Sequence, residues 1–168
     1  MPMSEFKRIY DTVFPIIYRV TRRIAGSDEA AEDLCQEAFF KFLEKNMDFP
    51  SADEAKYWLI RVAKNAALNY AKRKKRELKV YQKAFHEDTR EQISGEGEVI
   101  QKETKDDVRA ALEKLPANLR DVLTLKEWGE LNYNEIGRIL GISEGNVKIR
   151  VFRAREKLHS ILAAASGG

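Results

Sequence analysis

Apolar residues recur at intervals of three and four along nearly every patterned segment of this chain, and that period restricts its fold to helices. In the segment 6–21 the apolar positions are Ile9, Val13, Ile16, Ile17 and Val20. This spacing places the five side chains on one face of an α-helix. Nowhere do apolar and polar residues alternate long enough for a half-buried strand, so the sequence predicts an all-α protein.

Three long helices are expected in the first half of the chain. The first contains Pro15, which predicts a bend or an interruption, and it ends at Gly26. Ser27 or Asp28 caps the second, which extends from 29 to about 46. Its apolar stripe consists of Leu34, Ala38, Phe39, Phe42 and Leu43. After a proline-containing loop over 46–51, the third helix extends from 55 to about 77.

The helical pattern is lost over residues 78–105, where the stretch 94–98 has the polar, glycine-containing and acidic composition of a linker. Helical period returns at 106, stops at Pro116 and resumes after it. We therefore expect two small helical domains, 1–77 and 106–168, joined by a flexible acidic linker over 78–105.

The formal net charge of only +3 hides two cationic segments. Residues 56–83 contain ten lysines and arginines against one acidic residue, and residues 148–168 contain five against one. Between them, residues 84–107 contain eight acidic residues against three basic ones. Two separate cationic segments suggest two contacts with a polyanion, although solvated helix faces have the same composition.

Residues 133–158 have the pattern of a helix-turn-helix. Gly137 would let its two helices approach closely, Gly141 would end the first in the left-handed conformation, and Ser143 would cap the second. The second helix of this motif enters the major groove of DNA. Its inward positions are Val147, Val151, Ala154 and Leu158, which leaves as DNA-binding candidates Asn146, Lys148, Ile149, Arg150, Phe152, Arg153 and Arg155. Phe152 could contact thymine methyl groups or fill the core.

The helix expected over 55–77 mixes cationic, amide and aromatic side chains. Cations hold a phosphate backbone, whereas amides and aromatic faces suit exposed bases. The candidates are Lys64, Asn65, Asn69, Tyr70, Lys72, Arg73 and Arg76. Core packing is the alternative for Tyr70 and for Trp58.

Three ordered blocks of the chain resemble a group IV (extracytoplasmic-function, ECF) sigma factor of bacterial RNA polymerase. They are AEDLCQEAFFKFLEK (31–45), YWLIRVAKNAALNYAKRKKR (57–76), and the stretch 112–158 that begins LEKLPANLRD and ends VKIRVFRAREKL. The resemblance covers nearly the whole chain except the linker and the termini. It implies a region 2 in the first half and a region 4 in the second.

The resemblance also implies roles for particular residues. Asp33, Leu34, Gln36 and Glu37 resemble a motif whose polar side docks on the β′ coiled coil of core polymerase, and region 4 would contact the β flap. The loop 46–51, with Asn46 and Phe49, would hold a flipped non-template base of the −10 element beside the candidates on the third helix. The second helix of the helix-turn-helix would read the −35 duplex. An anti-sigma factor is a further expected partner.

Other classes of protein fit the sequence less well. A stand-alone helix-turn-helix regulator would explain 133–158 but would leave the Asp33–Glu37 motif and the basic third helix without a role, and an anti-factor or scaffold protein is a further alternative. An enzyme is not expected, because the chain has no P-loop, nucleophile elbow or metal-ligand cluster, and we expect no metal and no cofactor. No apolar run approaches the roughly 18 residues of a membrane span, so a cytoplasmic protein is expected. The single cysteine, Cys35, adjoins an apolar stripe and is expected to be buried and inert rather than a redox sensor.

Overall fold

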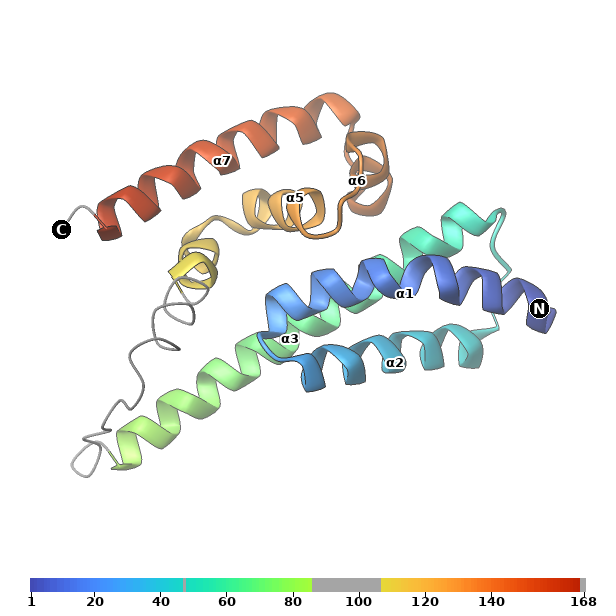
Figure 1. Ribbon diagram of the computed structural model, residues 1–168, viewed down its shortest axis with the longest axis horizontal. Coiled ribbons are helices and arrows are strands. Elements are labelled where there is room, and N and C mark those ends of the chain that lie inside the picture. Colours follow the sequence, from blue (N-terminus) through green and yellow to red (C-terminus); the bar gives the residue numbers. More distant parts are fainter. Residues whose placement is uncertain (47, 86–106, 167–168) are drawn as a thin grey trace.

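The computed structural model describes residues 1–46, 48–85 and 107–166, and helices account for most of them (Figure 1). The elements are α1 (Met3–Ala25), α2 (Asp28–Lys45), α3 (Ala52–Phe85), α5 (Ala117–Glu127), α6 (Tyr133–Leu140) and α7 (Glu144–Ser166). Residues 107–114 are also helical. The described residues include no strand, which confirms the all-α prediction.

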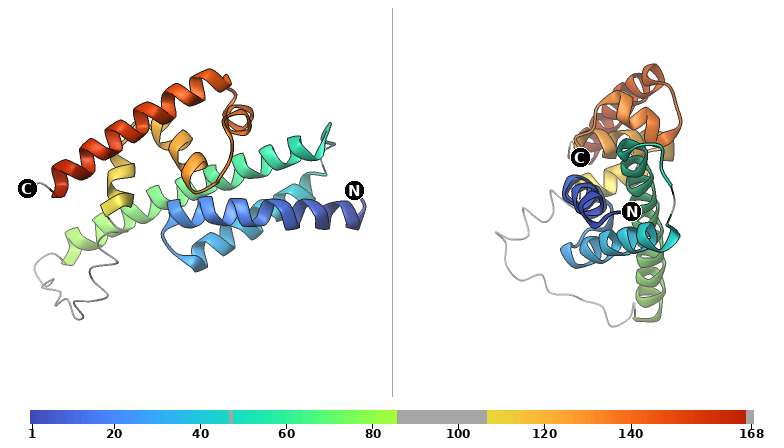
Figure 2. Two further views of the ribbon diagram at one scale, coloured as in Figure 1. Left: turned by 45° about the horizontal axis from the view of Figure 1, so that its top comes forward. Right: turned by 90° about the vertical axis from the view of Figure 1, so that its right-hand side faces the viewer.

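Helices α1, α2 and α3 pack together as the first helical unit, with α1 in contact with both of the others (Figure 2). Its interior is apolar, and Ile17, Leu59 and Ile60 have no exposed surface. Burying such a side chain contributes about 1.5–3 kcal/mol. In α2 the predicted stripe is buried from Leu34 to Phe42, whereas Leu43 is 53% exposed and was wrongly placed in it.

Pro15 does not interrupt α1, which is continuous from Met3 to Ala25. The buried residues Val13 and Ile17 flank the proline and pack into the same core. An interior proline costs about 3 kcal/mol or more, but burial of the apolar face on both sides offsets it. Tertiary packing therefore outweighs the local signal.

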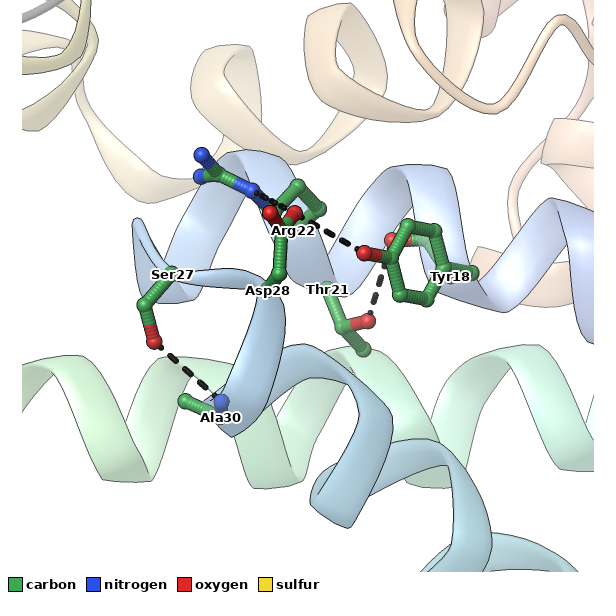
Figure 3. A network of polar contacts seen from close by, with 6 residues as sticks. All are labelled: Tyr18, Thr21, Arg22, Ser27, Asp28 and Ala30. Atoms are coloured by element: carbon green, nitrogen blue, oxygen red, sulfur yellow. Dashed lines mark hydrogen bonds and ion pairs between the residues drawn. The ribbon is translucent and has the colours of Figure 1, made fainter.

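The turn between α1 and α2 is held by short-range polar contacts (Figure 3). Gly26 ends α1 with a φ of 86°, and the hydroxyl of Ser27 accepts a hydrogen bond from the Ala30 N–H at 3.2 Å. Asp28 Oδ1 instead accepts from the Tyr18 hydroxyl at 2.9 Å and from Arg22 Nε at 2.6 Å. Of the two predicted caps, Ser27 is thus the N-cap, and Asp28 ties the start of α2 back to α1.

Helix α3 extends eight residues beyond the predicted end at Glu77, to Phe85. The extension contains no glycine or proline, so nothing in it breaks a helix. Its apolar side chains Leu78, Val80 and Tyr81 are exposed, which is why no buried stripe marked it as helical. The remainder of the predicted linker, including 94–98, lies outside the described residues.

Helices α5, α6 and α7 form the second helical unit together with residues 107–114 (Figure 1). Two helical units were expected, but they are in direct contact here: α6 packs on α3, and α5 touches α1. One apolar cluster extends from Ile17 and Leu59 of the first unit to Leu125, Ile136 and Val147 of the second.

Candidate nucleic-acid interface

Helix α6 is fixed at its start by a reciprocal capping box. The Glu135 N–H donates to Asn132 Oδ1 at 2.8 Å, and the Asn132 N–H donates to Glu135 Oε1 at 3.1 Å. The sequence prediction missed this cap, although the spacing of Asn132 and Glu135 is the signal that announces one. The cap defines where the helix-turn-helix begins.

The turn between α6 and α7 has the geometry that its glycines and serine predicted. Gly141 adopts a φ of 72° and ends α6, and the hydroxyl of Ser143 accepts from the Asn146 N–H at 3.1 Å. A Cβ on Gly137 would lie 2.6 Å from the Ile142 carbonyl oxygen, so only glycine allows this close approach. These contacts set the direction of α7, and all three predictions are confirmed.

The two faces of α7 differ sharply. Val147, Val151 and Ala154 are buried, as predicted, whereas Ile149 and Phe152 are 49% and 63% exposed. Phe152 therefore does not fill the core. The outward side also carries the exposed residues Asn146, Lys148 and Arg153 and the half-buried Arg150.

Arg155 is the one predicted member of this face that is already engaged by a carboxylate in the described structure. Its Nε lies 2.9 Å from Glu127 Oε1 of α5, and this hydrogen bond raises the pKa of Arg155 above its usual value. Because the pair is at the surface, it contributes at most about 1 kcal/mol.

A second polar stripe lies on α3. Asn65, Asn69, Lys72 and Arg76 follow one another at helical spacing and are exposed, as is Arg73 beside them. The half-buried Tyr70 has Arg73 and Lys74 5.8 and 5.7 Å from its ring centre. Six of the seven predicted α3 residues are thus on or beside one accessible surface.

Lys64 is the exception, because it is only 6% exposed. Its Nζ lies 3.3 Å from Asp121 Oδ2 of α5. In this arrangement of the two helical units it cannot reach a DNA backbone. Sequence reasoning could not anticipate this, because Asp121 lies 57 residues further along the chain.

The loop after α2 brings Asn46 and Phe49 to the rim of one cavity of about 370 Å³, whose other wall includes Glu5 and Ile9 of α1. Asn46 ends α2 in the left-handed conformation, with a φ of 44°. Phe49 packs between Phe42 and Trp58, with ring centres 5.6 and 5.9 Å away. Trp58 is therefore half-buried support for this loop, as the core alternative anticipated.

Helix α2 presents Asp33, Gln36 and Glu37 to solvent, whereas Leu34, which belongs to the same motif, is buried. The three polar residues form one wall of a groove of about 730 Å³, and Tyr70 and Arg73 of α3 form the other. The groove thus places an acidic-polar face next to the α3 stripe. Phe40, 71% exposed on the same wall, was not among the residues that the sequence prediction named for this face.

Ion pairs and hydrogen bonds join the two helical units along α3 and α6. Lys56 Nζ lies 2.5 Å from Glu135 Oε2, Arg138 pairs with Glu54, and Arg61 Nε donates to the Ile139 carbonyl oxygen at 2.8 Å. Burial would raise the pKa of Glu135, but the hydrogen bonds and charge of Lys56 and the Asn132 N–H lower it overall.

Cys35 is fully buried, as predicted, and its Sγ lies 3.3 Å from the Thr21 hydroxyl. Burial raises the pKa of its thiol to about 11. Over the described ranges, no three His, Cys, Asp or Glu side chains gather as metal ligands would. Nor does any helix among the described residues combine the length and the apolar character that crossing a membrane requires.

Two family models match the chain in consecutive segments. The model described as Sigma-70 region 2 matches residues 9–77, and the one described as Sigma-70, region 4 matches residues 105–158. The first segment holds the α2 face and the α3 stripe, and the second holds the helix-turn-helix.

Characterised relatives match over most of their length. The ECF RNA polymerase sigma factor SigM of Bacillus subtilis is 32% identical over 155 residues, which cover 91% of this chain and 92% of SigM. The ECF RNA polymerase sigma factor SigW of the same organism is 30% identical over 165 residues, or 94% and 88% of the two chains. The ECF RNA polymerase sigma-E factor of Escherichia coli is 32% identical over 148 residues, or 83% and 76%.

Solved structures agree on the fold. CnrH, in complex with the cytosolic domain of CnrY, superposes with a TM-score of 0.67 at 21% identity, over 95% of this chain and 88% of CnrH. The sigma factor RpoE of Bartonella quintana, in complex with the anti-sigma factor NepR, gives a TM-score of 0.59 at 22% identity, over 95% and 98%. Since SigM is 32% identical over nearly its whole length and the region 2 and region 4 models match in order, this chain belongs to the ECF sigma factors of the sigma-70 family.

Proposed function

We propose that this protein is a bacterial transcription initiation factor that binds core RNA polymerase and directs it to promoters, without catalysis of its own. The observation that carries the proposal is the pair of separate exposed faces, on α3 and on α7, that combine cations with side chains able to read bases. A stand-alone regulator would use only the second. We assign residues 1–77 to the binding of core polymerase and of the −10 element, 106–168 to the binding of the −35 element, and 78–105 to the connection between them.

Helix α7 would read the −35 element as intact duplex. Lys148, Arg150 and Arg153 would bind phosphates or guanine edges, and Asn146 lies at the N-terminal end of the helix, where this motif meets base edges. The exposure of Ile149 and Phe152 supports apolar contact with thymine methyl groups. Arg155 would join them by exchanging Glu127 for a phosphate.

The α3 stripe and the cavity beside Asn46 and Phe49 would capture the melted −10 strand. Cationic side chains at 72, 73 and 76 suit a phosphate backbone, and the amides of Asn65 and Asn69 suit unpaired base edges. Unstacking one base costs a few kcal/mol, which such contacts can offset. Melting would then be driven by binding energy alone.

The exposed polar wall of α2, formed by Asp33, Gln36 and Glu37, would dock on the β′ coiled coil of the polymerase, and the second helical unit would dock on the β flap. Mounting both DNA-binding units on one polymerase raises the effective concentration of each without new DNA contacts. We also propose a cytoplasmic location and an anti-sigma partner, because RpoE of Bartonella quintana was solved in complex with the anti-sigma factor NepR and CnrH in complex with the cytosolic domain of CnrY.

Run-off transcription tests this function. The purified chain with bacterial core polymerase should initiate at a promoter that carries both elements, and the double variant Lys148→Ala with Arg153→Ala should lose at least tenfold of that activity. Lys157→Ala is the matched control, since it removes an exposed cation from the same helix further from its N-terminal end. Sequence-specific DNA binding by the chain alone, with no affinity for core polymerase, would favour the stand-alone regulator instead.

A further inference from the structure

A cavity of about 230 Å³ lies between the two helical units, bounded by the end of α1, the middle of α3, the helical segment 107–114 and α5. Its lining is strongly cationic. Six basic side chains reach it, against only two carboxylates, those of Glu113 and Asp121; the basic residues are Arg23, Lys64, Lys72, Lys75, Arg109 and Arg120.

The two carboxylates are already engaged. Asp121 pairs with Lys64 at 3.3 Å and lies 4.0 Å from Arg120 Nε, and Glu113 pairs with Lys75 at 3.7 Å. Of the other cations in the lining, Arg23 and Lys72 are paired with neither of these carboxylates. Cations that gather around a concave site raise the local concentration of anions.

Three guanidinium nitrogens at this cavity are buried and lack hydrogen-bond acceptors in the described part of the chain. Arg23 Nε and Nη2 and Arg120 Nε are buried with no hydrogen-bond partner among the described residues. The Arg23 guanidinium is fixed in place by the ring of Trp128, 4.3 Å away. Burial and the charges of Arg109 and Arg22 lower the pKa of Arg23. Buried donors of this kind are normally paired with an acceptor, so these N–H groups are suited to donate to a ligand oxygen.

We propose that this cavity binds a small phosphate-type anion, free inorganic phosphate or pyrophosphate, and we call it the interunit anion site. Guanidinium N–H groups in a fixed plane match tetrahedral oxyanions and form strong charge-assisted hydrogen bonds with them. The volume lies below the roughly 300–1,000 Å³ of sites for larger ligands, which favours a free anion over a whole nucleotide.

The interunit anion site has residues of both helical units in its lining. Arg23 belongs to α1 of the first helical unit and Arg120 to α5 of the second, so one anion would bridge the two units. The anion would stabilise the arrangement of the two units in which Lys64 is paired with Asp121. Any effect of the anion on promoter binding rests on the proposed function, but the binding of the anion does not.

Isothermal titration of the full chain with inorganic pyrophosphate, at constant ionic strength set with chloride, tests the site. We expect one saturable site, and a rise of about 3 °C in the melting temperature at a ligand concentration ten times the dissociation constant. Arg23→Gln should weaken binding at least tenfold. Arg22→Gln is the matched control: it removes the same charge one residue away, but Arg22 faces Asp28 at the surface (Figure 3), and binding should stay within twofold.

Lys72→Gln provides a second variant, because an exposed lysine can be replaced without disturbing the fold, and it should weaken binding several-fold. A nucleoside triphosphate should bind at least tenfold more weakly than pyrophosphate; tighter binding would contradict a free anion. Equal binding by Arg23→Gln and Arg22→Gln, or no saturable binding, would overturn the proposal. Since the titration contains neither polymerase nor DNA, its failure would leave the proposed function untouched.

Discussion

Lys64 illustrates how one side chain can take part in two incompatible contacts. By sequence it lies among cations and amides that suit single-stranded DNA, but the structure buries it against Asp121 of the other helical unit. A lysine at this depth needs an anionic partner, and a carboxylate or a DNA phosphate would each serve. If Lys64 contacts promoter DNA, the two units must first separate.

The Cys35 thiol leads to a prediction about pH. Burial raises its pKa from 9.0 to about 11, so the folded state holds the proton more tightly than the unfolded state does. Its contribution to stability is complete below pH 9 and is lost as the pH rises toward 11. Between pH 8 and pH 10.5 the loss should be about 2 kcal/mol, measured as the free energy of unfolding in urea at the two pH values.

Cys35→Ala is the control for that measurement, because it removes the only cysteine and should flatten this part of the pH dependence. A thiol reagent should likewise react with the native protein far more slowly than with the urea-unfolded chain at pH 8. Rapid labelling of the native protein would show that Cys35 is accessible and would reinstate the redox-sensor alternative.

At the scale of elements, the sequence predicted those helix ends and turns that depend only on neighbouring residues. Gly141 and Ser143 specify the turn of the helix-turn-helix by their own conformational and hydrogen-bonding preferences, and both were predictable. The continuity of α1 through Pro15 was not, because packing of distant residues decides it. The length of α3 was missed for a different reason. Its last turns are exposed, and the spacing of apolar residues can reveal a helix only where one of its faces is buried.

Gly137 offers a test in which two effects oppose each other. Replacing it with alanine gains up to about 1 kcal/mol of helix propensity. However, the new Cβ would lie 2.6 Å from the Ile142 carbonyl oxygen, and shifting backbone to relieve such overpacking costs about 1–3 kcal/mol. We therefore expect Gly137→Ala to destabilise the protein by about 1 kcal/mol in thermal unfolding.

Gly145, in the first turn of α7, is the matched position, because a Cβ there meets nothing within 4 Å. Gly145→Ala should raise stability by about 0.5–1 kcal/mol through propensity alone. The two variants thus make the same chemical change, but their expected effects on stability have opposite signs. If both were stabilising, the turn between α6 and α7 would have to move freely away from the Gly137–Ile142 contact.

At the scale of the whole molecule, the contact between the two helical units could not be predicted from the sequence. Its ion pairs join residues about eighty positions apart, and neither α3 nor α6 carries a pattern that singles out the other. The candidate DNA-binding residues were predictable because each face is local to one helix. What could not be predicted is which of them this contact covers, and Lys64 is the example.

Charge reversal along the edge of α3 tests what holds the units together. Glu54→Arg combined with Lys56→Glu leaves the net charge unchanged but sets like charges against Arg138 and Glu135. An exposed pair such as Arg138–Glu54 contributes only about 0–1 kcal/mol, whereas the Lys56–Glu135 pair is mostly buried. Turning both attractive pairs into repulsive ones should open the contact at low salt. The radius of gyration from small-angle X-ray scattering at 0.1 M salt should therefore increase.

The matched control is Lys74→Glu with Glu77→Lys, which reverses an exposed ion pair within α3 and also conserves net charge. It should leave the radius of gyration unchanged. Raising the salt concentration should shrink the difference between the α3 edge variant and the native chain, because screening weakens attraction and repulsion alike. An edge variant as compact as the native chain would mean that the shared apolar cluster around Leu125 and Ile136 holds the units together without help from charge. In that case promoter binding would have to expose this apolar surface, and only a partner that covers it, such as the polymerase, could offset the cost.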